Sequence, residues 1–218
     1  FSLLRQVELR LELPPVKRRV ITELGYGTNA KLLGQYTARV WRSVHNASGT
    51  VYTDNGLQSL WDAVRGQEGT AGILTTFLGG KSGVQVGAGT PEARVLETLP
   101  WIEAIFPGTA ATYRPGHALR MHWPSAPFAL GSYAAYRPGQ TAFEGIEGRR
   151  VGNLHFCGEH TSVAFQGLME GACATGALTA QAVLNDMGLP TEHILHASGK
   201  PMVTVLRPCL VREEQTCP

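Results

Sequence analysis

The segment from Phe156 to Gly176, FCGEHTSVAFQGLMEGACATG, contains the residue types best suited to holding a ligand. Glu159 follows a short apolar run, and a helical pattern begins near Gly167. The first turn of a helix presents unpaired backbone N–H groups and a partial positive charge, which suit an anionic or electron-rich edge of a ligand. A carboxylate at Glu159 could accept hydrogen bonds from hydroxyl groups, as the acidic residue of a nucleotide site does. The segment is therefore a candidate ligand site at the start of a helix.

The glycines of this segment admit two interpretations. Gly167, Gly171 and Gly176 lie in or beside the predicted helix, where each glycine costs roughly 0.5–1 kcal/mol relative to alanine. They could leave the backbone bare for contact with a flat ligand, or they could let the helix pack closely on a sheet. The residue types alone favour neither interpretation.

The elements that position this segment follow from periodicity. A short apolar strand is expected over residues 152–157, followed by a tight loop and a helix from about Gly167 to Met187. The apolar residues expected on the buried side of this helix are Met169, Ala172, Cys173, Ala180, Val183 and Leu184.

Upstream, the chain predicts a sheet with helices. Val16, Val20 and Leu24 have helical spacing, and that helix should end near Gly25. Strands are expected over 28–41, 49–54 and 72–80, with a turn or helix cap at 54–56, which together suggest a mixed sheet. A second helix should be capped by Thr90, end before Pro107 and break near Pro100. Residues 123–139 are rich in proline and glycine and predict a loop.

Composition excludes several classes of function. The 218 residues are 43% hydrophobic and 17% charged with a net charge of +2, typical of a soluble globular protein of one or two domains. The sequence has no long run of like charges, so a nucleic-acid partner is not indicated. It also has no apolar run long enough to cross a bilayer. The four cysteines lack CxxC spacing, which disfavours a zinc site, while Cys209 and Cys217 could pair or remain free thiols.

Residues 156–184, FCGEHTSVAFQGLMEGACATGALTAQAVL, resemble the C-terminal FAD-binding signature of the flavin-containing amine oxidase family, which includes monoamine, polyamine and L-amino acid oxidases. Upstream, YGTNAKL resembles the strand that carries the flavin-site lysine, and YTDNGLQSLWD and IFPG resemble bacterial members. WPSAPFALGSYAAYRPG resembles the loop that passes the flavin ring. The resemblance covers residues 1 to about 187 and leaves the remaining tail unexplained.

One family motif is missing. Family members bind the adenosine half of FAD with an N-terminal GxGxxG unit, and GVQVGAGT at residues 83–90 has the wrong spacing for it. The resemblance thus implies an N-terminal FAD-binding partner, as the other product of proteolytic processing, as a separate subunit, or as a portion lost by truncation. The start at Phe1 without a methionine favours processing.

The resemblance assigns roles to individual residues. Lys31 matches the lysine that holds a water near flavin N5, where hydride arrives and dioxygen later takes electrons; without the match it would be a solvated strand lysine. Trp123 matches the tryptophan beside the isoalloxazine, although a lone tryptophan is more often a core residue. The remaining matches are Gly131, Ser132 and Tyr133 on the flavin face, Gly158 and Glu159 at the ribityl and pyrophosphate region, and Gly167, Leu168, Met169 and Ala172 at the pyrimidine edge and the helix that follows it.

Two departures bear on cofactor and substrate. Gly131 stands where mitochondrial monoamine oxidases have the cysteine that binds flavin covalently, so FAD should be noncovalent. The paired tyrosines of their aromatic cage align with Ser132 and Leu168, which leaves Tyr133 and Phe165 as partial substitutes. An amine and an L-amino acid are therefore both open as substrates.

These observations lead to one expected architecture. The chain should be an α+β / α/β protein, the C-terminal part of a two-domain FAD-dependent fold, with a substrate-binding domain over 1–120, an FAD-binding portion over 121–187 and a tail over 188–218. The expected reaction is oxidative deamination with dioxygen as acceptor and no metal. Alternatives are a flavin monooxygenase or desaturase and a noncatalytic scaffold subunit. A homodimer of the assembled unit is possible, and a cytoplasmic or secreted location stays open.

Overall fold

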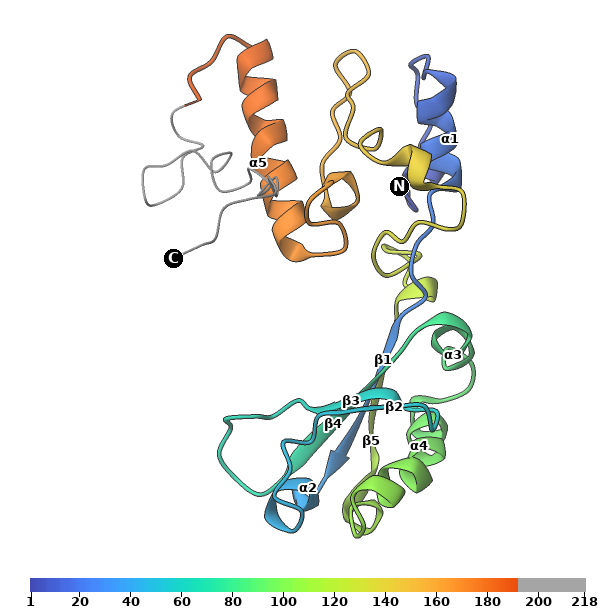
Figure 1. Cartoon of the computed structure of the whole chain (residues 1–218), viewed down its shortest axis with the longest axis vertical. Coiled ribbons are helices and arrows are strands. Elements are labelled where there is room, and N and C mark those ends of the chain that lie inside the picture. The colour runs from blue at the N-terminus through green and yellow to red at the C-terminus, as the bar shows by residue number, and fades with distance from the viewer. Residues whose placement is uncertain (192–218) are drawn as a thin grey trace, which may run out of the picture. The chain divides into compact units, whose positions relative to one another are not determined.

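The computed structural model describes residues 1–191, and it divides the chain into two compact units (Figure 1). The helical unit comprises Phe1–Tyr26 and Tyr133 onward, and the sheet unit comprises Gly27–Ser132. The α+β class expected from the sequence is confirmed, whereas the functional domains 1–120, 121–187 and 188–218 remain predictions. The Cys209–Cys217 pairing and most of the predicted tail lie outside the described residues.

The sheet unit contains one five-stranded antiparallel sheet. Its strands are β1 (Ala30–Tyr36), β2 (Val51–Thr53), β3 (Gln58–Asp62), β4 (Gly72–Leu78) and β5 (Tyr113–His122), in the order β2-β3-β4-β1-β5. Every pairing between these strands is antiparallel, so the mixed sheet expected from the sequence was wrong in this detail. The connections between β2, β3 and β4 are too short for the crossovers that parallel neighbours require.

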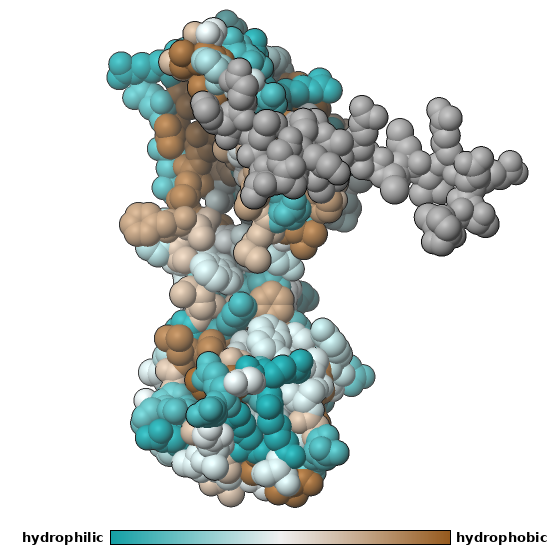
Figure 2. Space-filling model, turned by 90° about the vertical axis from the view of Figure 1, so that its left-hand side faces the viewer, coloured by the Kyte–Doolittle hydropathy of each residue, from teal (hydrophilic) through white to brown (hydrophobic). Residues whose placement is uncertain are grey.

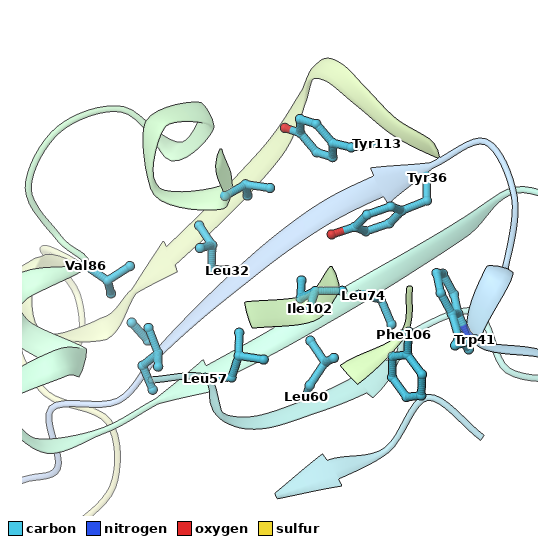
Figure 3. Packing of buried hydrophobic residues seen from close by; sticks show 13 residues of the cluster. Leu32, Tyr36, Trp41, Leu57, Leu60, Leu74, Val86, Ile102, Phe106 and Tyr113 are labelled. Carbon is cyan, nitrogen blue, oxygen red and sulfur yellow. The ribbon is translucent and has the colours of Figure 1, made fainter. Parts of the chain in front are cut away.

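One face of this sheet packs on helix α4 (Pro91–Ile105). Leu32, Leu60 and Leu74 point from three strands toward Ile102, and Tyr36 and Trp41 close one end of the same core (Figure 3). The strand predicted over 28–41 is shorter in the structure. β1 ends at Tyr36, and a short helix α2 (Val40–Ser43) carries the buried Trp41. A further short helix, α3 (Gly80–Gln85), follows β4.

Helix α4 begins as the sequence predicted but does not break. The Thr90 side chain accepts a hydrogen bond from the backbone N–H of Ala93, which is the expected N-cap. The predicted break at Pro100 is wrong, because α4 continues through it to Ile105. Val95 and Ile102 on either side of Pro100 are both buried in the core, and this packing offsets the hydrogen bond that proline cannot make.

The helical unit is built around α1 (Pro15–Glu23) and α5 (Met169–Asp186), with short 3₁₀ turns at Leu4–Gln6, Thr141–Phe143 and Glu159–Thr161. The strand predicted over 152–157 is not formed, and only an isolated bridge joins Val151 to Leu154. A strand needs a neighbour for its backbone groups, and no other described segment pairs with this run. No helix among residues 1–191 is long and apolar enough to cross a membrane.

Helix α5 exposes much of the side expected to be buried. Met169 is 88% exposed, and Cys173 and Ala180 are exposed as well, while Gly171 and Ala174 are the buried residues of the helix. The prediction was wrong for these three side chains. The other three predicted residues, Ala172, Val183 and Leu184, are half-buried, so the described residues cover only part of the apolar side of α5.

Candidate functional site

The turn Gly158–Thr161 is fastened to helix α5. Gly158 adopts a φ of +130°, which a residue with a side chain rarely adopts. Its backbone N–H donates to Thr175 Oγ1 of α5 at 3.0 Å, and its carbonyl accepts from the Thr161 N–H at 3.0 Å. Thr175 Oγ1 in turn lies 2.7 Å from the carbonyl of Gly171. The start of the predicted cofactor turn thus has a fixed place relative to the helix.

Glu159 uses both carboxylate oxygens on the backbone. Oε1 accepts a hydrogen bond from the Ala134 N–H at 2.8 Å, and Oε2 accepts one from the Gly167 N–H at 2.7 Å. Hydrogen bonds to a charged acceptor are stronger than those between neutral groups. Glu159 therefore joins two segments that the sequence analysis placed near flavin.

The three glycines have three different explanations. Gly167 lies just before α5 with a φ of +81°, so its backbone conformation favours glycine. A Cβ on Gly171 would lie 2.2 Å from the carbonyl oxygen of Phe165, so close packing requires the bare backbone there. A Cβ on Gly176 would meet open space. The packing interpretation thus holds for Gly171, although its neighbour is a loop and not a sheet.

The N-terminus of α5 has the properties expected of a ligand-binding helix end. Its N-cap residue, Leu168, makes no side-chain hydrogen bond to the first turn. Leu168 is 57% exposed, and Met169 beside it is 88% exposed. Figure 2 shows exposed apolar residues of the chain in brown. The Tyr133 ring lies next to Gly167, since a Cβ there would be 3.7 Å from Tyr133 Cδ2. The backbone N–H groups at this end therefore lack a side-chain cap, and the partial positive charge there suits an anionic or electron-rich group.

Sequence reasoning missed two titratable residues near the turn, the half-buried His160 and the buried Lys17. Burial lowers the pKa of His160 to about 4, and its ring lies beside Gly158. Burial lowers the pKa of Lys17 to about 8, although its ammonium donates to the carbonyls of Ile146 and Glu147 and lies 3.7 Å from the centre of the Phe156 ring. The one sequence signal near Lys17 was the helical spacing of Val16, Val20 and Leu24, which does not reveal that a lysine between them is buried.

In the sheet unit, Lys31 lies on the sheet face opposite α4. Residues 31 and 32 point to opposite faces, and Leu32 is in the core. Phe77 and Met121 are the cross-strand neighbours of Lys31, and its Nζ is 5.8 Å from the Trp61 ring centre. No hydrogen bond or ion pair of the Lys31 ammonium occurs within residues 1–191. Its charge is therefore available to a water or a ligand.

The loop after β5 is tied to the segment before β1. Trp123 begins a 3₁₀ turn, and its carbonyl accepts from the Gly131 N–H at 3.2 Å. The Ser132 N–H donates to the carbonyl of Gly27 at 2.9 Å, and its hydroxyl donates to the side chain of Asn29 at 2.7 Å. These bonds bring three predicted flavin residues to the chain that leads into Lys31.

The predicted site residues thus form one group in each unit. Lys31, Trp123, Gly131 and Ser132 belong to the sheet unit, and Tyr133, Gly158, Glu159, Gly167, Leu168, Met169 and Ala172 belong to the helical unit. No cluster of three or more His, Cys, Asp or Glu residues in the described chain could hold a metal ion. The roles of the predicted site residues toward a cofactor remain predictions.

The curated relatives include an L-amino acid dehydrogenase and several flavin-containing amine oxidases. The chain is 27% identical over 176 residues to an L-amino acid dehydrogenase of Synechocystis sp., covering 79% of this chain and 36% of that protein. It is 24% identical over 194 residues to flavin-containing amine oxidase B of Cavia porcellus, covering 87% and 37%. The chain therefore spans little more than a third of the length of these relatives.

Solved structures share the fold. Cyclohexylamine oxidase from Brevibacterium oxydans superposes with a TM-score of 0.75 at 24% identity, over 86% of this chain and 42% of that one. Putrescine oxidase bound to putrescine gives a TM-score of 0.74 at 20% identity, over 84% and 41%. Residues 1–184 match the model of the flavin containing amine oxidoreductases. The chain belongs to the flavin-containing amine oxidoreductase family.

Proposed function

We propose that the complete protein is an FAD-dependent oxidase that deaminates a primary amine or an L-amino acid. The carbon that bears the neutral amine loses a hydride equivalent and the nitrogen a proton, which gives an imine. Water converts the imine to a carbonyl compound and ammonia, and dioxygen takes the two electrons with two protons to form hydrogen peroxide. The observation that carries the proposal is the uncapped N-terminus of α5 beside Gly167 and Tyr133, in a chain of this family.

The residues of the chain would hold the cofactor without a covalent bond. When bound, FAD supplies the two-electron acceptor that no protein side chain provides. The backbone N–H groups at the start of α5 would stabilise negative charge at the pyrimidine edge, and Gly167 would keep that approach open. Gly131 has no side chain to bond to flavin, which supports noncovalent binding. Lys31 would orient a water and place positive charge where dioxygen is reduced.

The two proposed substrate classes come from the names of the curated relatives and of the solved structures. One relative is named for L-amino acids, and two solved structures are named for cyclohexylamine and putrescine. Ser132 and Leu168 stand where monoamine oxidases have the two tyrosines of their aromatic cage. An amine could not be stacked between two tyrosines here, so this feature does not favour an amine over an L-amino acid. Both classes therefore belong in the substrate panel.

A larger N-terminal portion would complete the cofactor site. The chain spans 35–37% of the length of three curated relatives and 42% of the cyclohexylamine oxidase structure. The exposed apolar side of α5, with Met169 and Cys173, is the surface that such a portion could cover. This portion would supply the GxGxxG unit, as a cleaved chain, a separate subunit or a continuous segment. The assembled unit could also form a homodimer.

The test is a product balance on the native protein. The purified sample is run on a denaturing gel beside its visible spectrum, and then supplied with cyclohexylamine, putrescine and a set of L-amino acids. The proposal expects a flavin spectrum, a second polypeptide or a longer chain, and equal amounts of ammonia and peroxide from at least one substrate. Bound flavin with no product from any substrate would favour the scaffold alternative, and oxygenated or desaturated products would favour the other flavin reactions.

A further inference from the structure

The carboxylate of Glu159 links two segments that are far apart in the sequence. The Ala134 N–H and the Gly167 N–H each donate to a different oxygen, at 2.8 and 2.7 Å. Ala134 follows Tyr133 directly, and Gly167 precedes the exposed Leu168 at the start of α5. One side chain thus sets the separation of the Tyr133 ring and the helix N-terminus.

The backbone that carries the Glu159 side chain is itself hydrogen-bonded to α5. Glu159 follows Gly158, whose N–H donates to Thr175 of α5 at 3.0 Å. The α5 helix, the turn, the carboxylate and the two N–H groups therefore form one connected set of hydrogen bonds. Gly167 lies before the first turn of the helix with a φ of +81°, and its N–H donates to Glu159 instead of to a helix carbonyl.

We propose that Glu159 is a positioning residue, which shapes the flavin site through Ala134 and Gly167 and does not bind the cofactor through its carboxylate. This inference deepens the proposed function and rests on it for the identity of the ligand. It replaces the expectation that Glu159 accepts hydrogen bonds from FAD hydroxyls. The geometry supports it because each carboxylate oxygen already accepts a charge-assisted hydrogen bond from the backbone.

The first arm of the test does not involve flavin. Glu159→Gln keeps the shape of the side chain but places an amide NH₂, which cannot accept a hydrogen bond, against one of the two N–H groups. Amide hydrogen exchange is measured on the full-length protein by mass spectrometry of peptides spanning 131–137 and 163–170. We expect exchange to rise about 10–100-fold at Ala134, Gly167 or both, the range for loss of a hydrogen bond to a charged group. Glu170→Gln, at an exposed carboxylate in the first turn of α5, is the matched control and should leave exchange at Ala134 and Gly167 unchanged.

The second arm reads the flavin. In Glu159→Gln, we expect the FAD dissociation constant to rise at least about tenfold. We also expect the visible spectrum and reduction potential of the remaining bound flavin to shift, because the donors at its edge have moved. Weaker FAD binding with unchanged exchange at both amides would mean that Glu159 binds the cofactor directly, which overturns the proposal. Faster exchange with an unchanged flavin would reduce Glu159 to a structural role and overturn it equally.

A second variant covers the case in which Glu159→Gln does not fold. Glu159→Asp retains the charge but is one methylene too short to span both N–H groups, so at least one of the two amides should lose protection. Full protection of both amides in the aspartate variant contradicts the proposal. Absence of flavin from the wild-type protein refutes the proposed function and the flavin part of this inference, while the exchange data still decide whether the carboxylate holds both amides.

Discussion

At the residue scale, Gly167 and Gly176 differ although both are glycines of the α5 segment. Gly167 has a φ of +81° and a neighbouring Tyr133 ring, whereas Gly176 is in the helix interior with open space where a Cβ would be. The sequence showed three glycines with helical spacing but not which of them is conformationally required, because φ depends on the turn that the folded chain makes. The structure therefore separates a required glycine from a tolerated one.

The first prediction uses this difference. Gly167→Ala should lower the free energy of unfolding by about 1–2 kcal/mol, because a side chain is disfavoured at positive φ. Gly176→Ala should raise it by about 0.5–1 kcal/mol, since alanine favours a helix interior over glycine. Urea denaturation of both variants measures the two changes, and equal effects of the same sign would contradict this account of the glycines.

The second prediction concerns Lys31, whose ammonium makes no hydrogen bond or ion pair within the described residues. Lys31→Met keeps most of the side-chain length but removes the charge. We expect substrate reduction of the enzyme to slow only modestly, whereas reaction of the reduced enzyme with dioxygen should slow about tenfold or more. Lys81→Met, at an exposed lysine of α3, is the control. Stopped-flow absorbance measures each half-reaction, and wild-type rates in both would remove Lys31 from the site.

At the element scale, local sequence signals located helices well and strands less well. Thr90 and Pro91 define the start of α4 as predicted, because capping depends on adjacent residues. The run at 152–157 failed as a strand, since a strand depends on a neighbour that the local sequence cannot reveal. Pro100 failed as a helix break for the opposite reason, because core contacts of Val95 and Ile102 outweigh a local signal.

Helix α1 illustrates a contact that no local pattern predicts. Lys17 is 2% exposed, and its ammonium holds the carbonyls of residues 146 and 147, about 130 positions along the chain. The apolar spacing of Val16, Val20 and Leu24 predicted this helix but gave no sign of a buried lysine on it. The buried site exists only because two distant segments meet.

The third prediction follows from the Lys17 pKa. Burial lowers this pKa from 10.5 to about 8, so the folded protein releases the proton at a lower pH than the unfolded chain does. Between pH 8 and 10.5 the unfolded state binds more protons, and the Lys17 contribution to stability therefore increases with pH across this window. The stability difference between wild type and Lys17→Met should shift in favour of wild type from pH 8 to 10.5. Denaturant titrations at several pH values measure it, and a constant difference would contradict the prediction.

At the scale of the whole molecule, the family and the fold class were predictable from the sequence, and the arrangement of the site was only partly so. The resemblance over residues 156–184 identified the family, and the model of that family matches residues 1–184. The sequence analysis assigned Glu159 to the cofactor, whereas the structure shows both of its oxygens on backbone N–H groups. Such a contact depends on loops that approach one another only after folding.

The central claim, that this chain is part of a flavin-dependent amine or amino acid oxidase, is tested most directly by anaerobic titration. The native full-length protein is mixed without oxygen with each member of the substrate panel while its visible absorbance is recorded. The account predicts that at least one amine or L-amino acid bleaches the flavin, and that admitting oxygen restores the colour and produces peroxide. A bound flavin that dithionite reduces but that no member of the panel reduces would contradict the claim.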